Sequence, residues 1–75
     1  MSPKLPVVSG KQIIAALESA EFTTVSQRGS HVKLRHPSGK VVIVPLHDEL
    51  AIGTLKSILR QAELDVDEFL RLILK

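Results

Sequence analysis

The sequence predicts an α+β domain of two layers, in which helices cover one face of a three-stranded antiparallel sheet. Apolar residues recur at the 3.6-residue spacing of a helix in residues 10–21 and again from residue 53 onward, whereas they alternate with polar residues between 23 and 44. Two short turns divide the alternating region into three strands. The expected order is therefore a helix, three strands, a second helix and a short third helix.

The length of the chain and its lack of cysteine limit the classes of function. Seventy-five residues form one domain, expected to span residues 1–75, with little room for a deep cofactor pocket. The sequence contains no Gly-rich phosphate loop, so we expect no cofactor. Without cysteine there is no disulfide and no thiolate metal site. No apolar run reaches the roughly 20 residues of a membrane span, and the start of the chain lacks a signal peptide, so we expect an intracellular, cytoplasmic protein.

The first helix has a well-defined start. Ser9 and Gln12 are spaced as a capping box, in which each side chain bonds the backbone amide of the other residue. Val8 and Ile13 are spaced as a hydrophobic staple, which packs the incoming chain against the first turn. The helix is expected over about residues 10–21.

Three strands are expected over residues 23–28, 31–36 and 40–44. Gly29-Ser30 is a two-residue turn of the glycine-first kind, which suits a tight hairpin. Pro37-Ser38-Gly39 is a three-residue turn, in which proline sets the first corner and glycine takes the left-handed conformation. The three strands therefore form an antiparallel meander.

The lengths of these turns fix the register of the sheet. The expected pairs across the first turn are Arg28–His31, Ser26–Lys33 and Val25–Leu34, and those across the second are Leu34–Val42 and Val32–Val44. One face is then apolar and covered by helices, and it presents Val25, Val32, Leu34, Val42 and Val44. The other face is open, and it presents Thr24, Ser26, Arg28, His31, Lys33 and Arg35 beside Val41 and Ile43. Apolar side chains among cations on an open face indicate a surface that a partner covers.

Two further helices follow a loop over residues 46–52. The second helix is expected over residues 53–62, where apolar residues again have helical spacing. Asp65 and Glu68 are spaced as another capping box, so the third helix begins at Asp65. Its expected apolar stripe is Val66, Phe69, Leu70 and Ile73, which leaves Leu72 and Leu74 at positions where exposure is expected.

Basic residues are concentrated in the middle third of the chain. Residues 1–22 carry two bases and two acids, residues 23–46 carry four bases and no acid, and residues 47–75 carry four bases and six acids. This distribution favours one surface that binds an anion such as nucleic acid. Basic runs are also common on solvated surfaces without a partner, so charge alone does not identify one.

Several short motifs lie along the chain, and the first is the stretch Gln27-Arg28-Gly29-Ser30-His31. The others are His36-Pro37, then Val44-Pro45 with His47, then Ile52-Gly53-Thr54-Leu55, and the apolar positions Ile58, Leu59 and Ala62. The first stretch resembles the R-x-G-S-H signature of HicA toxins, and the other motifs are similar to the rest of that family's pattern and occur in its order. The matches cover about residues 9–70. The order of the elements is also that of double-stranded-RNA-binding domains, so the expected fold is of that kind with an added short C-terminal helix.

The resemblance implies a toxin that cleaves mRNA independently of the ribosome and is neutralised by a HicB-type antitoxin. It also implies that His31, the histidine of the Gly-Ser-His turn, is catalytic. Two positions depart from the family. Many members have a second histidine where this chain has Val32, so that His31 has no adjacent histidine to share the proton transfer. Many also have glycine at Glu63, where a helix ends and a left-handed residue is usual.

The residues around His31 suit metal-independent RNA cleavage. RNA supplies its own nucleophile, the 2′-hydroxyl, and histidine can remove a proton near neutral pH. Nearby cations can stabilise the charge that develops on the phosphate oxygens. We assign His31 as the catalytic base, and the predicted RNA-binding residues are Arg28, Ser30, Lys33, Arg35 and Lys40. No side chain is an evident acid for the leaving 5′-oxygen; His31 itself or water could return the proton.

Alternatives remain open at this stage. Apart from the family resemblance, His31 could be a surface residue after a turn. His36, at the hairpin corner, suits a structural role or a phosphate contact, and His47 is a weak candidate for RNA contact. His31 and His36 are five residues apart on a strand and so face opposite sides, which argues against a metal site. Two other functions are a non-catalytic double-stranded-RNA-binding module and a protein-interaction domain that uses Val41, Ile43, Leu72 and Leu74.

Overall fold

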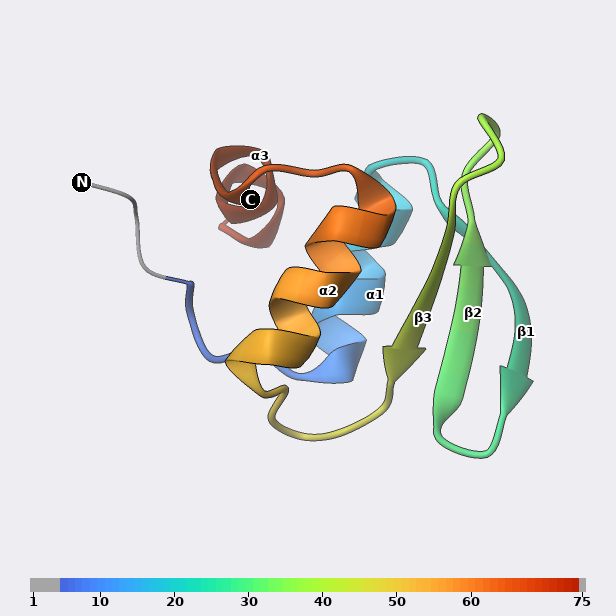
Figure 1. Cartoon of the computed structure of the whole chain (residues 1–75), viewed down its shortest axis with the longest axis horizontal. Helices are drawn as coiled ribbons and strands as arrows, with labels where there is room; N and C mark the ends of the chain where they lie inside the picture. The colour runs from blue at the N-terminus through green and yellow to red at the C-terminus, as the bar shows by residue number, and fades with distance from the viewer. Residues whose placement is uncertain (1–4, 75) are drawn as a thin grey trace.

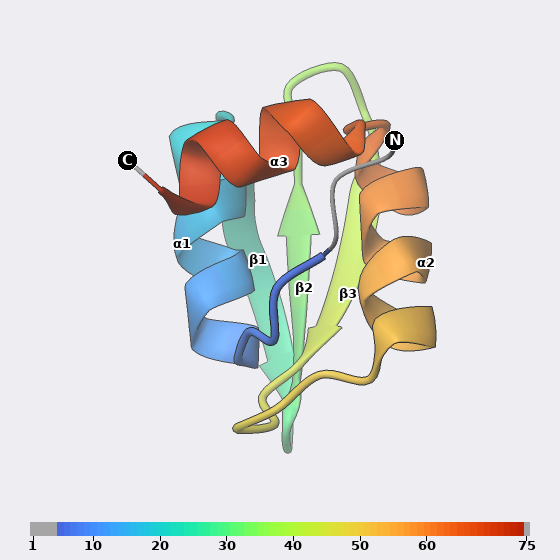
Figure 2. The ribbon, with the colours of Figure 1, turned by 90° about the vertical axis from the view of Figure 1, so that its left-hand side faces the viewer.

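The computed structural model describes residues 5–74; residues 1–4 and 75, which the predicted domain includes, lie outside that range. The elements are α1 (Gly10–Ser19), β1 (Thr23–Arg28), β2 (His31–Arg35), β3 (Val41–Pro45), α2 (Ile52–Ala62) and α3 (Val66–Ile73). The strands form one antiparallel sheet in the order β1-β2-β3. All three helices lie on one side of this sheet (Figures 1 and 2). The predicted α+β class and the predicted order of elements are confirmed.

Both predicted capping boxes are formed. The Gln12 amide donates to Ser9 Oγ at 3.1 Å, and the Ser9 amide donates to the Gln12 side chain at 2.8 Å. At the start of α3, the Glu68 amide donates to the Asp65 carboxylate at 2.8 Å, and the Asp65 amide donates to the Glu68 carboxylate at 3.4 Å. These reciprocal bonds satisfy amides that the first turn of a helix leaves free, and they fix where each helix begins.

The core lies between the helices and the inner face of the sheet. Its buried apolar side chains are Val8, Ile13, Ala16, Leu17, Phe22, Val32, Leu34, Val42, Val44, Leu50, Leu55, Ile58, Leu59, Ala62 and Phe69. In β2 and β3 burial alternates along the strand, as expected for a sheet with one covered face. The sheet residues that face the core are therefore those predicted from the sequence in β2 and β3.

The predicted pairing of β1 is correct next to the first turn and wrong farther from it, at Val25 and Thr24. Arg28 pairs with His31 and Ser26 with Lys33 as expected, but a bulge follows, and Thr24 rather than Val25 pairs with Leu34. A bulge inserts one extra residue into a strand and reverses the faces of the side chains beyond it. Val25 is therefore 51% exposed instead of buried, and Thr24 is aligned with the inner side of the sheet.

The helices after the sheet agree with the prediction apart from one side chain and two boundaries. The second helix begins at Ile52, one residue earlier than expected. The third helix begins at Val66, one residue later than expected, with Asp65 as its N-cap. Phe69 is the fully buried side chain of α3. Leu74 is 80% exposed as expected, but Leu72 is half-buried and packs against the core. Among residues 5–74, no helix is both long enough and apolar enough to cross a membrane.

Candidate nucleic-acid interface

The face of the sheet turned away from the helices is open. Every residue of β1 is exposed, and β2 alternates between buried and exposed positions. The exposed side chains of β2 are His31, Lys33 and Arg35, which follow one another at every second position. Beside them on β3, Val41 and Ile43 are 39% and 40% exposed. This face therefore combines basic, imidazole and apolar side chains, as the sequence predicted.

A tight turn sets the position of His31 at the start of β2. Gly29 has a φ of 55°, a conformation that favours glycine, and Arg28 and His31 are the cross-strand pair that closes the turn. The Gln27 side chain donates to the Gly29 carbonyl at 3.0 Å, which adds a bond across the turn. The His31 side chain is exposed, and its cross-strand partner is an arginine. The turn thus presents the imidazole to solvent beside a guanidinium.

A shallow hollow of about 280 Å³ lies on this face and includes the predicted catalytic histidine. It is lined by Ser26, Arg28, His31, Lys33 and Ile43. Three of the predicted site residues, Arg28, His31 and Lys33, are therefore brought together. The other two, Ser26 and Ile43, were not predicted as site residues, although the strand register places both on this face.

The remaining predicted RNA-binding residues lie outside this hollow. Arg35 lines a separate hollow of about 360 Å³ near the other end of β2, about 13 Å along the strand from His31. Lys40 lies before β3, half-buried, and its carbonyl accepts a bond of 2.9 Å from the His36 amide. Ser30 is exposed in the first turn, next to His31. The predicted site is thus a compact cluster at one end of β2, with further basic residues toward the other end.

His36 has a structural environment, which agrees with its predicted role. Its Nδ1 atom lies 2.9 Å from Ser38 Oγ and accepts a bond of 3.0 Å from the Ser38 amide. Its ring packs against Phe22, with the two ring centroids 5.1 Å apart. These contacts stabilise the turn between β2 and β3. Among residues 5–74, no group of three or more His, Cys, Asp or Glu residues is arranged to hold a metal ion.

Val32 occupies the position where the resemblance to HicA toxins led us to expect a second histidine. Its side chain is 4% exposed and points into the core, because neighbouring residues on a strand face opposite sides. A histidine at this position of the same backbone would point away from the hollow. The identity of residue 32 therefore affects the packing of the core. Valine in place of histidine at this position does not remove a proton acceptor from the open face.

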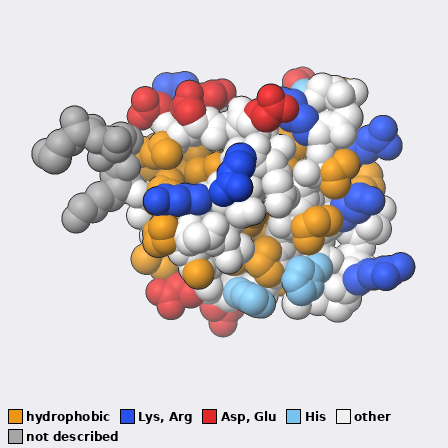
Figure 3. Space-filling model, in the orientation of Figure 1, with side chains coloured by type: hydrophobic (Ala, Val, Ile, Leu, Met, Phe, Trp, Pro, Cys, Tyr) orange, Lys and Arg blue, Asp and Glu red, His pale blue; other side chains and the backbone are white. Residues whose placement is uncertain are grey.

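Charge distinguishes the sheet side from the rest of the molecule. Residues 23–46, which form all three strands, contain four basic and no acidic residues. In the view of Figure 3, lysine and arginine side chains occupy the edge where the sheet lies and also parts of the helix side, whereas acidic side chains appear at edges away from the sheet. An uncompensated basic face attracts anions such as the phosphates of a nucleic acid.

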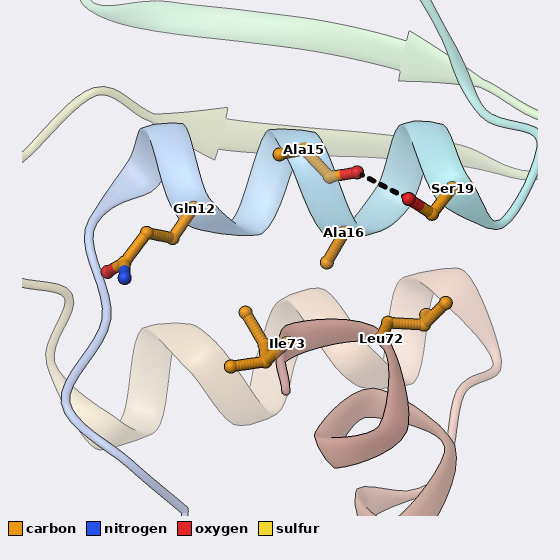
Figure 4. Close-up of a pocket in the computed structure, with 6 residues that line it drawn as sticks. All are labelled: Gln12, Ala15, Ala16, Ser19, Leu72 and Ile73. Carbon is orange, nitrogen blue, oxygen red and sulfur yellow. Dashed lines mark hydrogen bonds between the residues drawn. The ribbon is translucent and has the colours of Figure 1, made fainter. Parts of the chain in front are cut away.

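A third hollow, of about 350 Å³, lies between α1 and α3 (Figure 4). It is lined by Gln12, Ala15, Ala16, Ser19, Leu72 and Ile73. The Ser19 hydroxyl donates to the Ala15 carbonyl at 3.2 Å, so this polar group is already bonded within α1. The lining carries no charged or imidazole side chain. This hollow therefore contains none of the predicted site residues.

Comparison with known proteins identifies the family. A search of curated proteins finds no match. A family model described as the HicA toxin of bacterial toxin–antitoxin systems matches residues 10–64, which extend from the start of α1 to just beyond α2. The match covers 55 of 75 residues and includes all three strands. The chain therefore belongs to the HicA toxin family: it is a toxin of a toxin–antitoxin system and has a cognate antitoxin as its partner.

Proposed function

We propose that this toxin is an endoribonuclease that binds mRNA and cleaves it without the ribosome and without a metal ion, using His31 as its base. A HicB-type antitoxin neutralises it. The observation that carries the proposal is the exposed imidazole of His31 in a hollow that Arg28 and Lys33 also line. The family to which the chain belongs supports a toxic activity.

The reaction needs few protein groups because the RNA provides the nucleophile. His31 removes the proton from the 2′-hydroxyl, and the resulting oxygen attacks the adjacent phosphorus. Negative charge grows on the phosphate oxygens as the new bond forms, and fixed cations stabilise that charge. Arg28 and Lys33 line the same hollow as His31 and are suited to this role. Arginine can also bond two phosphate oxygens at once, which would orient the phosphate for attack.

Further phosphates of the bound RNA lie along β2. Arg35 shares the open face with His31 and Lys33, because all three side chains alternate with buried residues. Ser30 contacts the RNA beside the catalytic histidine, and Lys40 contacts it beyond the far turn. The RNA therefore crosses the sheet from the first turn toward the second.

The antitoxin neutralises the toxin by covering the same face. Val41 and Ile43 are partly exposed among basic residues, so a partner with acidic and apolar side chains would bury them favourably. A partner placed there blocks access to His31. This surface includes Val41 and Ile43 of the protein-interaction function considered from the sequence. Leu72 and Leu74, the other two residues of that function, lie at the end of α3 on the opposite side of the sheet (Figure 2).

The test compares the purified toxin with its His31→Ala variant on a labelled mRNA, with and without EDTA. We expect the wild type to cut RNA in EDTA, and we expect His31→Ala to cut at least about 100-fold more slowly, since loss of a base removes roughly 10²–10⁴ in rate. The variant should keep its circular dichroism spectrum, because His31 is exposed. It should still bind the antitoxin, because Val41 and Ile43 remain on the covered face. Cleavage at the normal rate by His31→Ala would exclude His31 as the base. RNA binding without any cleavage by the wild type would favour the non-catalytic binding module.

A further inference from the structure

His47 lies in the loop after β3, and the backbone of this loop is bonded to two other segments of the chain. The Leu46 amide donates to the Ser30 carbonyl at 2.6 Å, which joins this loop to the turn that precedes His31. On the other side, the Gly10 amide donates to the His47 carbonyl at 2.9 Å. Gly10 itself is buried, and a Cβ atom there would collide with the Pro45 carbonyl. The backbone of residues 45–47 is thus fixed between the first hairpin turn and the start of α1.

This anchoring brings His47 close to His31. Pro45 is the cross-strand partner of His31, and His47 follows Pro45 by two residues. The Cα atoms of the two histidines are therefore no more than about 13 Å apart, given the spacing of paired strands and the reach of two residues. His47 is exposed, as His31 is. Figure 3 shows histidine side chains along the lower edge of the molecule in that view.

The proposed reaction has a chemical requirement that the hollow around His31 does not meet. When the 2′-oxygen attacks, the bond from phosphorus to the 5′-oxygen breaks, and that oxygen leaves more easily if it receives a proton. Arginine and lysine side chains hold their protons too firmly to serve well as acids near neutral pH. Histidine is suited to the role. His36 lies at the far end of β2 with its Nδ1 atom already bonded, which leaves His47.

We propose that His47 is the general acid of the cleavage reaction, an inference that rests on the proposed function. The 2′-oxygen forms a bond to phosphorus and gives its proton to His31, while the bond to the 5′-oxygen breaks and that oxygen takes a proton from the His47 imidazolium. The products are a 2′,3′-cyclic phosphate and a 5′-hydroxyl. Bound RNA places its scissile phosphate between the two imidazoles, at the end of the hollow nearest the first turn.

The test uses two substrates that differ in one atom. The first is an ordinary oligonucleotide, and the second carries sulfur in place of the 5′-oxygen at the cleaved bond. A thiolate leaves without being protonated, so loss of the acid should not slow cleavage of the sulfur substrate. We expect His47→Ala and His47→Gln to cut the ordinary substrate at least about 30-fold more slowly than the wild type and the sulfur substrate within about threefold of it. His31→Ala should be slow on both substrates.

The controls separate this inference from the proposed function. Glu49→Ala changes another exposed side chain of the same loop and should cut both substrates at the wild-type rate. If His47→Ala cuts the ordinary substrate normally while His31→Ala does not, His47 is not the acid and the proposed function stands. If the deficit of His47→Ala is equally large on the sulfur substrate, His47 acts in binding or positioning, which also overturns the inference. If the wild type cuts neither substrate, the proposed function itself fails.

Discussion

Glu21 and Glu63 are the two non-glycine residues with positive φ among residues 5–74, at 73° and 55°. Each follows a helix and adopts the left-handed conformation that closes it. After α2, the Glu63 amide bonds the Arg60 carbonyl and the Leu64 amide bonds the Leu59 carbonyl, the pattern of a Schellman motif. A side chain with a Cβ atom is strained in this conformation, whereas glycine is not. The resemblance to HicA toxins indicated a left-handed residue at this helix end, and Glu63 occupies that position.

Glu63→Gly should therefore stabilise the protein. The expected gain in the free energy of unfolding is about 0.5–1 kcal/mol, since relief of strain is partly offset by the greater freedom of glycine in the unfolded chain. Urea unfolding followed by circular dichroism measures it. Glu63→Ala is the matched control, because it removes the same carboxylate but keeps the Cβ atom, and it should give no comparable gain. A lower stability of the glycine variant would contradict the role of strain at this position.

At the scale of elements, the predictability of the sheet depends on how much apolar pattern each strand carries. Strands β2 and β3 alternate clearly, and their pairing agrees with the prediction from the turn lengths. Strand β1 has one apolar residue, Val25, among six. A single apolar side chain specifies the register only weakly, so the bulge next to it could not be recognised from the sequence. The prediction therefore failed in β1, the strand with the fewest apolar residues.

The bulge leads to a prediction that compares two valines of the same sheet. Val42 is fully buried and Val25 is 51% exposed. Val42→Ala should lower the free energy of unfolding by about 2 kcal/mol, because it removes buried methyl groups and leaves a cavity. Val25→Ala should change it by less than about 0.5 kcal/mol, as is usual for exposed positions. Urea unfolding measures both changes. Similar losses of the free energy of unfolding for the two variants would contradict the bulge and support the register predicted from the sequence.

At the scale of the whole molecule, the three helices gather on one side of the sheet and leave its other face uncovered (Figures 1 and 2). The exposed residues of β2 on that face include Lys33 and Arg35. The sequence predicted this face, since residues 23–46, which include the three strands, carry four bases and no acid. It also predicted the grouping of Arg28, His31 and Lys33, because a two-residue turn fixes their register. The anchoring of His47 could not be predicted, since it depends on contacts between segments far apart in the chain, such as Gly10 with Pro45. Local patterns therefore predicted the group around His31. The position of His47, by contrast, is determined by tertiary packing.

The central claim is that His31 activates the 2′-hydroxyl of the RNA itself. The most direct test is an oligonucleotide with one defined cleavage site, compared with the same oligonucleotide carrying a 2′-deoxy nucleotide immediately before that site. We predict that the toxin cuts the first in EDTA and leaves a 2′,3′-cyclic phosphate end, which mass spectrometry identifies, and that it does not cut the second at that site. Equal cutting of both oligonucleotides, or products with a 3′-hydroxyl and a 5′-phosphate, would show that water and not the ribose is the nucleophile, and would contradict the mechanism.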